Sequence, residues 1–222
     1  MILYRGIAVP TNRASKVIAD IRSRGLLPDQ GRWRFRFYDL KPLLPELRQR
    51  SIVTTADTEL EGEMPTWVCA CGDEMGAIYY ATKHNRDREN NTPVLISFDA
   101  NLRDVIIDGR DFLYRLFQCG NPQRARPVAE RAYGREILPY LDRAWATDDQ
   151  NQRVAMCHLA TQDDEVISAH LNNEAVIEGR YNTRFRSAFM VRTPVPAERI
   201  ISVETIEEVP LPDPEITLQT IR

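Results

Sequence analysis

The sequence predicts an α+β fold, and two observations carry the prediction. Segments with helical spacing and helix caps concentrate in the first two thirds of the chain, whereas strand-like runs dominate the last third. The chain has 222 residues, of which 43% are hydrophobic and 27% charged, as in ordinary globular proteins. At this length roughly 70% of the unfolded surface can be buried, so we expect a substantial core.

Caps and stop residues mark the helices of the first two thirds. Thr11 or Asn12 can cap a helix that Gly25 ends, and Asp111 can cap a later one. A longer helix contains Pro139, where it can break. We therefore expect helices over 13–24, 74–84, 111–118 and 128–145.

Strands are predicted from alternating and β-branched runs. In the first two thirds we expect them over 2–4, 32–37, 51–55, 66–71, 94–98 and 105–107. In the last third we expect them over 153–160, 165–171, 174–178, 186–193 and 199–206. The predicted organisation is a single domain over 1–222, with a helical insertion around 111–147 and a loosely attached, proline-containing tail at 210–222.

Charge and cysteine content narrow the class of protein. The net charge of −3 gives no overall basic field that would point to nucleic acid. No run approaches the roughly 18 apolar residues of a membrane span, and Arg5 interrupts the short apolar run at the N-terminus, which disfavours a signal peptide. Cys69, Cys71, Cys119 and Cys157 are too scattered for a disulfide scaffold. We expect a cytoplasmic protein with reduced thiols and no membrane partner.

A zinc site is the weaker interpretation of these cysteines. Cys69 and Cys71, together with Cys157 and His158, supply suitable ligand types, but from separated and mostly apolar segments. Buried cysteines that pack as small hydrophobic residues explain them better. His158 and His170 lie in strand-like runs and are expected to be structural. We therefore predict no metal site.

The most informative segment is Met1–Ile7, in which an apolar strand-like run reaches Arg5 and then Gly6. This places a guanidinium at the end of a strand, and the missing side chain of Gly6 leaves room for a ligand. Three later segments can complete one site with it. They are Trp67–Cys71 with the helix that follows, Pro93–Phe98, and Asn172–Ile177.

In this order, the four segments resemble the ADP-ribosyltransferase family of mono-ADP-ribosylating toxins and related bacterial enzymes. The family carries an Arg or His on its first strand, often as Tyr-Arg-Gly, which the segment at Arg5 matches. Ala77 to Ala81 matches its Ala-x-x-Tyr-Ala helix pattern. Glu174, with Asn172 two positions earlier and aliphatic residues after it, matches the catalytic glutamate at the start of a strand. The resemblance implies an ADP-ribosyltransferase-like split β-sandwich core with flanking helices.

The second strand departs from the family pattern. Enzymes with the Arg form usually have Ser-Thr-Ser there, where this chain has Cys69-Ala70-Cys71. A thiol is a poorer hydrogen-bond donor than a hydroxyl. Either the cysteines occupy the space without orienting a ligand, or a hydroxyl of Thr66 or of Ser51–Thr55 replaces them.

The resemblance implies NAD as co-substrate and assigns roles in its cleavage. The nicotinamide–ribose bond breaks through an oxocarbenium-like transition state, as in glycoside cleavage, and the Glu174 carboxylate stabilises the developing cation. Arg5, with Gly6 and Cys69 beside it, binds the pyrophosphate or the adjacent ribose. Tyr80, with Tyr79 as its alternative, stacks on the nicotinamide. No Gly-x-Gly-x-x-Gly fingerprint is present, which disfavours hydride transfer.

Each assignment has a structural alternative. Arg5 can be a strand-end residue that forms an ion pair with a surface carboxylate. At least one of Tyr79 and Tyr80 belongs to the core side of an amphipathic helix. Glu174 can be a solvated charge at a strand edge, with nearby Glu178 as the catalytic residue instead.

Residues 32–37 suggest the acceptor, because they alternate arginine with aromatic residues. Such pairs of cations and rings suit single-stranded nucleic acid, and Arg180, Arg184 and Arg186 can extend the surface. A solvated basic strand face explains the same pattern. We expect transfer to RNA, DNA or protein by a toxin or phage-defence effector, for which an antitoxin is a further partner. The alternative function is a non-catalytic module that binds nucleic acid or protein through 32–37.

Overall fold

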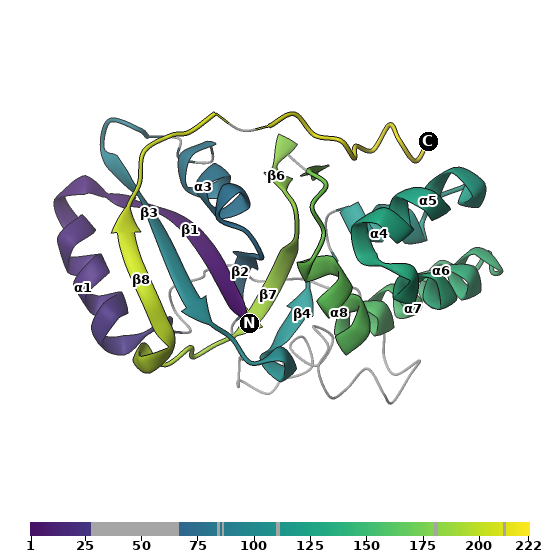
Figure 1. Cartoon of the computed structure of the whole chain (residues 1–222), viewed down its shortest axis with the longest axis horizontal. Helices are drawn as coiled ribbons and strands as arrows, with labels where there is room; N and C mark the ends of the chain where they lie inside the picture. The colour runs from purple at the N-terminus through teal and green to yellow at the C-terminus, as the bar shows by residue number, and fades with distance from the viewer. Residues whose placement is uncertain (28–66, 84, 86, 110–111, 180–181, 211) are drawn as a thin grey trace.

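The computed structural model of the chain describes residues 1–27, 67–83, 85, 87–109, 112–179, 182–210 and 212–222. These residues form a mixed fold in which helices flank an antiparallel sheet (Figure 1), and this confirms the predicted α+β class. The strands predicted over 32–37 and 51–55 and the cap predicted at Asp111 lie outside the described residues.

The main sheet has six antiparallel strands in the order β4-β7-β2-β1-β3-β8. Each of them overlaps a strand predicted from the sequence. Their bounds are β1 (Ile2–Pro10), β2 (Trp67–Cys71), β3 (Asn91–Asp99), β4 (Val105–Ile107), β7 (Ala188–Arg192) and β8 (Ile200–Thr205).

A weak seam between β1 and β2 divides this sheet. β1 pairs with β3 along its whole length, over nine residue pairs. It pairs with β2 at Tyr4↔Cys71 alone. Because antiparallel strands are held by the backbone hydrogen bonds of such pairs, the sheet consists of two three-stranded units, β8-β3-β1 and β4-β7-β2, which meet at one residue pair. We call this junction the sheet seam.

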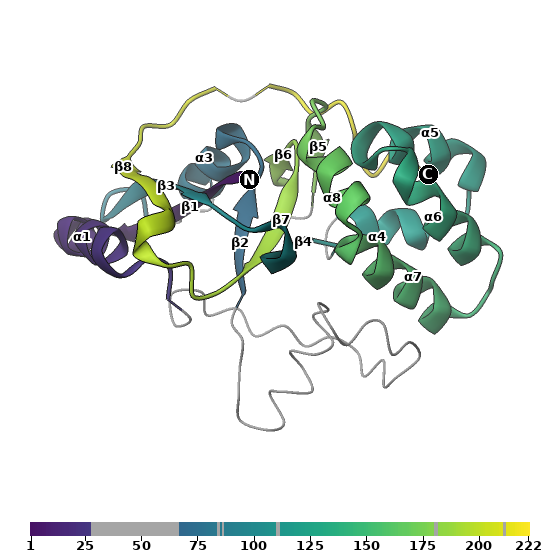
Figure 2. The same ribbon diagram turned by 60° about the horizontal axis from the view of Figure 1, so that its bottom comes forward.

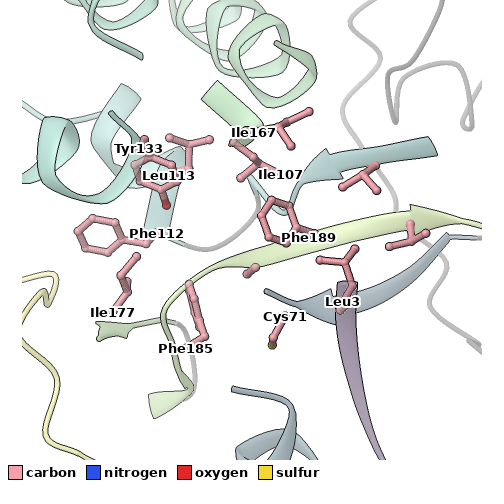
Figure 3. Packing of buried hydrophobic residues seen from close by; sticks show 14 of the residues in the cluster. Leu3, Cys71, Ile107, Phe112, Leu113, Tyr133, Ile167, Ile177, Phe185 and Phe189 are labelled. Atoms are coloured by element: carbon pink, nitrogen blue, oxygen red, sulfur yellow. The ribbon is translucent and has the colours of Figure 1, made fainter. Parts of the chain in front are cut away.

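The two faces of the sheet are covered by different helices. Successive residues of a strand face opposite sides, so Gly6 faces α3 (Glu74–Lys83) while Leu3 and Arg5 face away from it. Figure 3 shows Leu3 and Phe189 on the side of the helices that follow β4, and Cys71 on the side of α3. α1 (Ala14–Arg24), the predicted helix, packs against β8 at the far edge of the sheet.

The helical insertion is longer than predicted and runs through residue 171. Its helices gather beside β4 and β7, at the opposite end of the sheet from α1 (Figure 2). They are α4 (Phe112–Phe117), α5 (Pro122–Tyr133), α6 (Leu138–Trp145), α7 (Gln150–Gln162) and α8 (Asp164–Leu171). Short 3-10 turns are η1 (Thr11–Arg13), η4 (Leu102–Asp104), η5 (Arg135–Ile137) and η7 (Ala197–Arg199).

Two strand predictions, 153–160 and 165–171, were wrong, because these residues form α7 and α8. Both helices begin at a capping aspartate: Asp149 accepts two backbone N–H groups and Asp163 accepts two more. α7 buries a continuous run from Val154 to His158, and a helix buried on most sides shows no helical alternation in its sequence.

The long helix predicted over 128–145 is two helices. The break lies at Gly134, whose φ of 77° is in the left-handed region, and α5 ends there. Pro139 lies in the first turn of α6, where a proline fits without a kink. Among the described residues, no helix is long and apolar enough to cross a bilayer.

The predicted strand over 174–178 is shorter and separate from the main sheet. It begins only at Ile177, where β5 (Ile177–Glu178) pairs with β6 (Arg184–Phe185). The tail after residue 210 carries buried residues, Ile216 and Ile221, and the N–H of Glu178 donates to the carbonyl of Ile216 at 2.7 Å. The tail is therefore attached more firmly than its proline content predicts.

Candidate active site

Arg5 lies on β1 beside the sheet seam, one residue beyond the pair that joins the two units. It is only 9% exposed. Its Nη1 donates to the carbonyl oxygen of Cys69 on β2 at 2.8 Å. The guanidinium therefore reaches across the seam and binds the backbone of β2 where the regular pairing of β1 and β2 has stopped.

The guanidinium of Arg5 lacks a counter-charge in the described part of the chain. Burial lowers its pKa from the usual value, and the nearby thiols of Cys69 and Cys71 act in the opposite direction. A guanidinium presents a fork of N–H donors and stays protonated. Within the described ranges, the Cys69 carbonyl is its hydrogen-bond acceptor and no carboxylate pairs with it. The alternative of a strand-end ion pair is not seen there.

The space beside Gly6, predicted to receive a ligand, holds α3 instead. A Cβ added at Gly6 would lie 1.7 Å from the carbonyl oxygen of Ala77 and 2.9 Å from the nitrogen of Ala81. The backbone of the helix therefore approaches β1 too closely for any side chain. Gly6 holds the Tyr-Arg-Gly strand against the helix that carries Tyr79 and Tyr80, and does not provide a ligand surface on that face.

The two cysteines of β2 differ in their relation to Arg5. Cys71 is buried, and burial raises the pKa of its thiol well above the usual value, with the carboxylates of Asp73 and Asp108 adding to the rise. Its thiol is therefore neutral and packs toward α3 (Figure 3). Cys69 is half-buried and contributes its backbone carbonyl to Arg5. Neither contact needs the hydroxyl expected at these positions.

Tyr79 and Tyr80 are placed differently on α3. Tyr79 is buried, and its hydroxyl donates to the carbonyl of Asn182 between β5 and β6. This fixes Tyr79 as the tyrosine of the core side. Tyr80 is half-buried and packs at the margin of the core, so its ring has more surface available to a ligand.

Glu174 is exposed, between the buried residues Asn173 and Ala175 in the connection from α8 to β5, and does not start a strand of the main sheet. This connection, which we call the Glu174 turn, is held by Asn173, whose Oδ1 accepts from the N–H of Ala175 at 3.1 Å. Asn173 also donates from Nδ2 to the carbonyls of Ala175 and Arg186, at 2.8 and 2.5 Å. The side chain of Asn172 donates to the carbonyl of Ser168 at the end of its own helix.

Glu178, the alternative acid, is half-buried in β5. Its backbone is fixed on both sides, because it pairs with Arg184 of β6 and donates to Ile216 of the tail. Arg184 in turn donates to the carbonyl of Pro212 and to Asp213. Glu178 therefore belongs to a small packed ribbon, whereas Glu174 lies outside it.

Arg5 and Glu174 belong to the same end of the main sheet. The pair Tyr4↔Cys71 continues across the sheet to Ala188, the first residue of β7. Two residues before Ala188, the carbonyl of Arg186 accepts from Asn173, the neighbour of Glu174. Two surface hollows lie elsewhere, one between α1 and β8 and one between α5 and α6.

The two histidines expected to be structural, His158 and His170, are both buried. His170 uses both ring nitrogens, Nδ1 toward the carbonyl of Ala132 at 2.8 Å and Nε2 toward the N–H of Ala188 at 3.1 Å. Burial lowers the pKa of both His158 and His170 to about 4. No group of three His, Cys, Asp or Glu side chains within the described residues is arranged to hold a metal ion.

Several predicted contributors lie outside the described residues: 32–37, Ser51–Thr55, Thr66 and Arg180. Two residues that the motif analysis did not single out, Asp73 and Asn173, make the contacts around Arg186. Their sequence signals were an aspartate just before a helix and a polar residue beside the presumed catalytic one. Comparison with family models, with curated proteins and with solved structures found no match for this chain.

Proposed function

We propose that the chain is an NAD-dependent mono-ADP-ribosyltransferase that transfers ADP-ribose to RNA, DNA or protein. The proposal depends on the burial of Arg5 beside the sheet seam. Its guanidinium donates to a backbone carbonyl, that of Cys69, and pairs with no carboxylate among the residues that the structure describes. A buried cation without an anion is costly. The pyrophosphate of NAD would supply that anion and match the forked donors.

The sheet seam supports the same proposal. At the seam, β1 and β2 are joined by one residue pair, and the backbone beyond that pair is not held in a ladder between them. A ligand that binds there does not have to break a continuous set of strand hydrogen bonds. An ADP-ribosyltransferase-like core split at this place accounts for a charged residue in the middle of a sheet.

In the proposed reaction, the bond between C1′ of the ribose and the nicotinamide nitrogen breaks, and its electron pair leaves with nicotinamide. A nucleophilic atom of the acceptor then bonds to C1′ and releases its proton to solvent. Glu174 stabilises the oxocarbenium-like ribose and binds a ribose hydroxyl. We assign the stacking role on the nicotinamide ring to Tyr80, since the hydroxyl of Tyr79 bonds to Asn182 on the core side. Arg5 faces away from α3, so NAD would have to pass the sheet seam to reach both Arg5 and Tyr80.

The biological setting that we propose is a bacterial toxin or phage-defence effector in the cytoplasm, with an antitoxin as its neutralising partner. Such a protein modifies a macromolecule of its host or of an invading phage. NAD is consumed as a co-substrate and nicotinamide is released.

The direct test incubates the full chain with labelled NAD and separate pools of RNA, DNA and protein. Label in one pool and release of nicotinamide are expected, and the labelled pool identifies the acceptor. Glu174→Gln should lower turnover by about 100-fold or more, because it removes the charge that stabilises the transition state. Glu178→Gln is the matched control and should keep turnover within about threefold.

Two results would contradict parts of this proposal. If Glu178→Gln loses turnover and Glu174→Gln keeps it, the activity stands and the assignment of the acid is wrong. If the wild-type chain consumes no NAD with any pool, the enzyme proposal fails. The non-catalytic binding module then predicts affinity for nucleic acid or protein without turnover, and for nucleic acid this affinity decreases steeply with salt.

A further inference from the structure

The backbone of Arg186 is held from both sides by side chains that the proposed mechanism does not use. Its N–H donates to Oδ2 of Asp73 at 3.2 Å. Its carbonyl oxygen accepts from Nδ2 of Asn173 at 2.5 Å. Asp73 precedes α3, which carries Tyr80, and Asn173 immediately precedes Glu174. One backbone position therefore links the two elements proposed to contact the nicotinamide riboside part of NAD.

The two carboxylate oxygens of Asp73 accept hydrogen bonds from different segments. Oδ1 accepts from the N–H of Gly76 at 2.9 Å and caps the first turn of α3. Oδ2 holds the N–H of Arg186. The next residue, Ser187, accepts a backbone bond from Gly72 at 3.3 Å, so this contact is tied to the end of β2.

Asn173 uses its whole amide group around the Glu174 turn. The residue is 8% exposed, and its three bonds join the turn to itself at Ala175 and to the neighbouring segment at Arg186. Asn172, one position earlier, is exposed, and its side chain donates to the carbonyl of Ser168 at the end of its own helix, α8. The two adjacent asparagines therefore differ in one respect that matters here: only Asn173 connects the turn to another element.

We propose that Asp73 and Asn173 are positioning residues, which together fix the Glu174 turn relative to α3 through the backbone of Arg186. The inference rests on the proposed function. An exposed carboxylate on a turn must be held at the correct distance from the reacting ribose, because a misplacement of about 1 Å can lower a rate about 100-fold. These two side chains supply that constraint without touching NAD themselves.

The test compares the kinetics of NAD consumption by Asn173→Ala and Asn172→Ala, each in the full chain. Asn173→Ala should lower kcat by about 10- to 100-fold while the KM for NAD changes by less than about threefold, because binding groups remain and only the acid is displaced. Asn172→Ala should stay within about twofold of wild type. Thermal unfolding of both variants shows that the assay temperature lies below their transitions.

Asp73→Asn provides the second variant and covers the case in which Asn173→Ala does not fold. An asparagine keeps an oxygen for the cap of α3 but replaces the other oxygen with an N–H₂ group, which cannot accept from Arg186. We expect a fall in kcat of about 10-fold. Since both side chains act on the same backbone position, the double variant should lose little more than Asn173→Ala alone.

Three outcomes separate this inference from the function on which it rests. If the wild-type chain consumes no NAD, the proposed function fails and the positioning role fails with it. If the wild type and Glu178→Gln consume NAD while Glu174→Gln does not, but Asn173→Ala and Asp73→Asn keep the wild-type kcat, only the positioning role is overturned. Losses that are fully additive in the double variant would also overturn the shared action through Arg186.

Discussion

Arg5 and His170 are both buried basic side chains, and they differ in how completely they are bonded. His170 bonds through both ring nitrogens, to Ala132 and Ala188, and stacks on Tyr133 with ring centroids 4.3 Å apart. Because Nε2 accepts a hydrogen bond, the ring is neutral and carries its proton on Nδ1. The guanidinium of Arg5 donates from one nitrogen to the carbonyl of Cys69, and no carboxylate of the described residues forms an ion pair with it.

The two side chains also differ in how each can avoid the cost of a buried charge. Burial lowers the pKa of His170 to about 4, so the imidazole avoids the cost of a buried charge by losing its proton. A guanidinium has no such option. The two backbone partners of His170 indicate a role in the fold, whereas Arg5, which pairs with no carboxylate among the described residues, is the residue for which we propose an anionic ligand.

The largest expected effect comes from disturbing the strand that holds Arg5. Gly6→Ala should lower the free energy of unfolding by about 3 kcal/mol or more, because its Cβ would lie 1.7 Å from a backbone oxygen of α3. Gly120→Ala is the matched control, since no atom lies within 4 Å of the Cβ it would add. Urea unfolding measures both. Equal stabilities would show that α3 does not pack on β1 as described.

A smaller change in the free energy of unfolding is expected when the pH is lowered, and it tests whether His170 is held neutral in the fold. The pKa of His158 and of His170 is about 4 in the folded protein and 6.5 ordinarily, so below pH 6.5 the unfolded chain binds protons that the folded chain does not. Stability is therefore full above pH 6.5 and is lost as the pH falls toward 4, by about 2 kcal/mol for each histidine between pH 7 and pH 5.

Urea unfolding at the two pH values measures this loss. His170→Phe keeps an aromatic ring beside Tyr133 and removes one of the two groups, so it should show about half of the pH dependence. An unchanged dependence in that variant would mean that the ring of His170 is not held neutral in the fold.

The smallest stability effect, and the sharpest functional one, is expected at Arg5 itself. Arg5→Met should change the free energy of unfolding by less than about 1 kcal/mol, because an apolar side chain replaces a buried cation without an anion. It should lower kcat/KM for NAD by about 10- to 100-fold through loss of a charged hydrogen bond. Arg22→Met is the control, since Arg22 also bonds a carbonyl, that of Val203 at 2.7 Å, but at the surface.

A large loss of stability in Arg5→Met, with NAD consumption unchanged, would contradict the ligand-binding role that we propose for Arg5. Arg5 would then have a structural role, as His170 does. The same pair of measurements on Arg22→Met shows how much of any effect belongs to an arginine–carbonyl bond in general.

The strands of the main sheet could be predicted from the sequence because their apolar runs are short and flanked by turn residues. α7 could not be recognised from periodicity, since it buries the continuous run from Val154 to His158. α8 buries Val166, Ile167 and His170, which have helical spacing, and the strand prediction over 165–171 overlooked it. The capping residues Asp149 and Asp163 were the available signal, because a side chain that accepts the first free N–H groups marks the start of a helix.

The candidate site shows where local motifs stop being sufficient. The sequence identifies Arg5 as a cation on a strand, but its contact across the seam is with Cys69, 64 residues later in the chain. Asn172 matched the family pattern, whereas the residue with contacts is Asn173. Its partner, Arg186, lies beside Asn173 because β7 pairs with β2. This pairing joins segments far apart in the sequence, so no local motif predicts it.

The unit β8-β3-β1 also sets the order in which the protein can assemble during translation. β1 leaves the ribosome before β3, but the outer strand of their unit, Ile200–Thr205, is synthesised only after α1 and the helices from α3 to α8 have been made. A nascent chain that stops before Ile200 therefore cannot complete the strands on the β3 side of Arg5. The three-stranded unit β8-β3-β1 can therefore form only in chains that have been synthesised through Thr205.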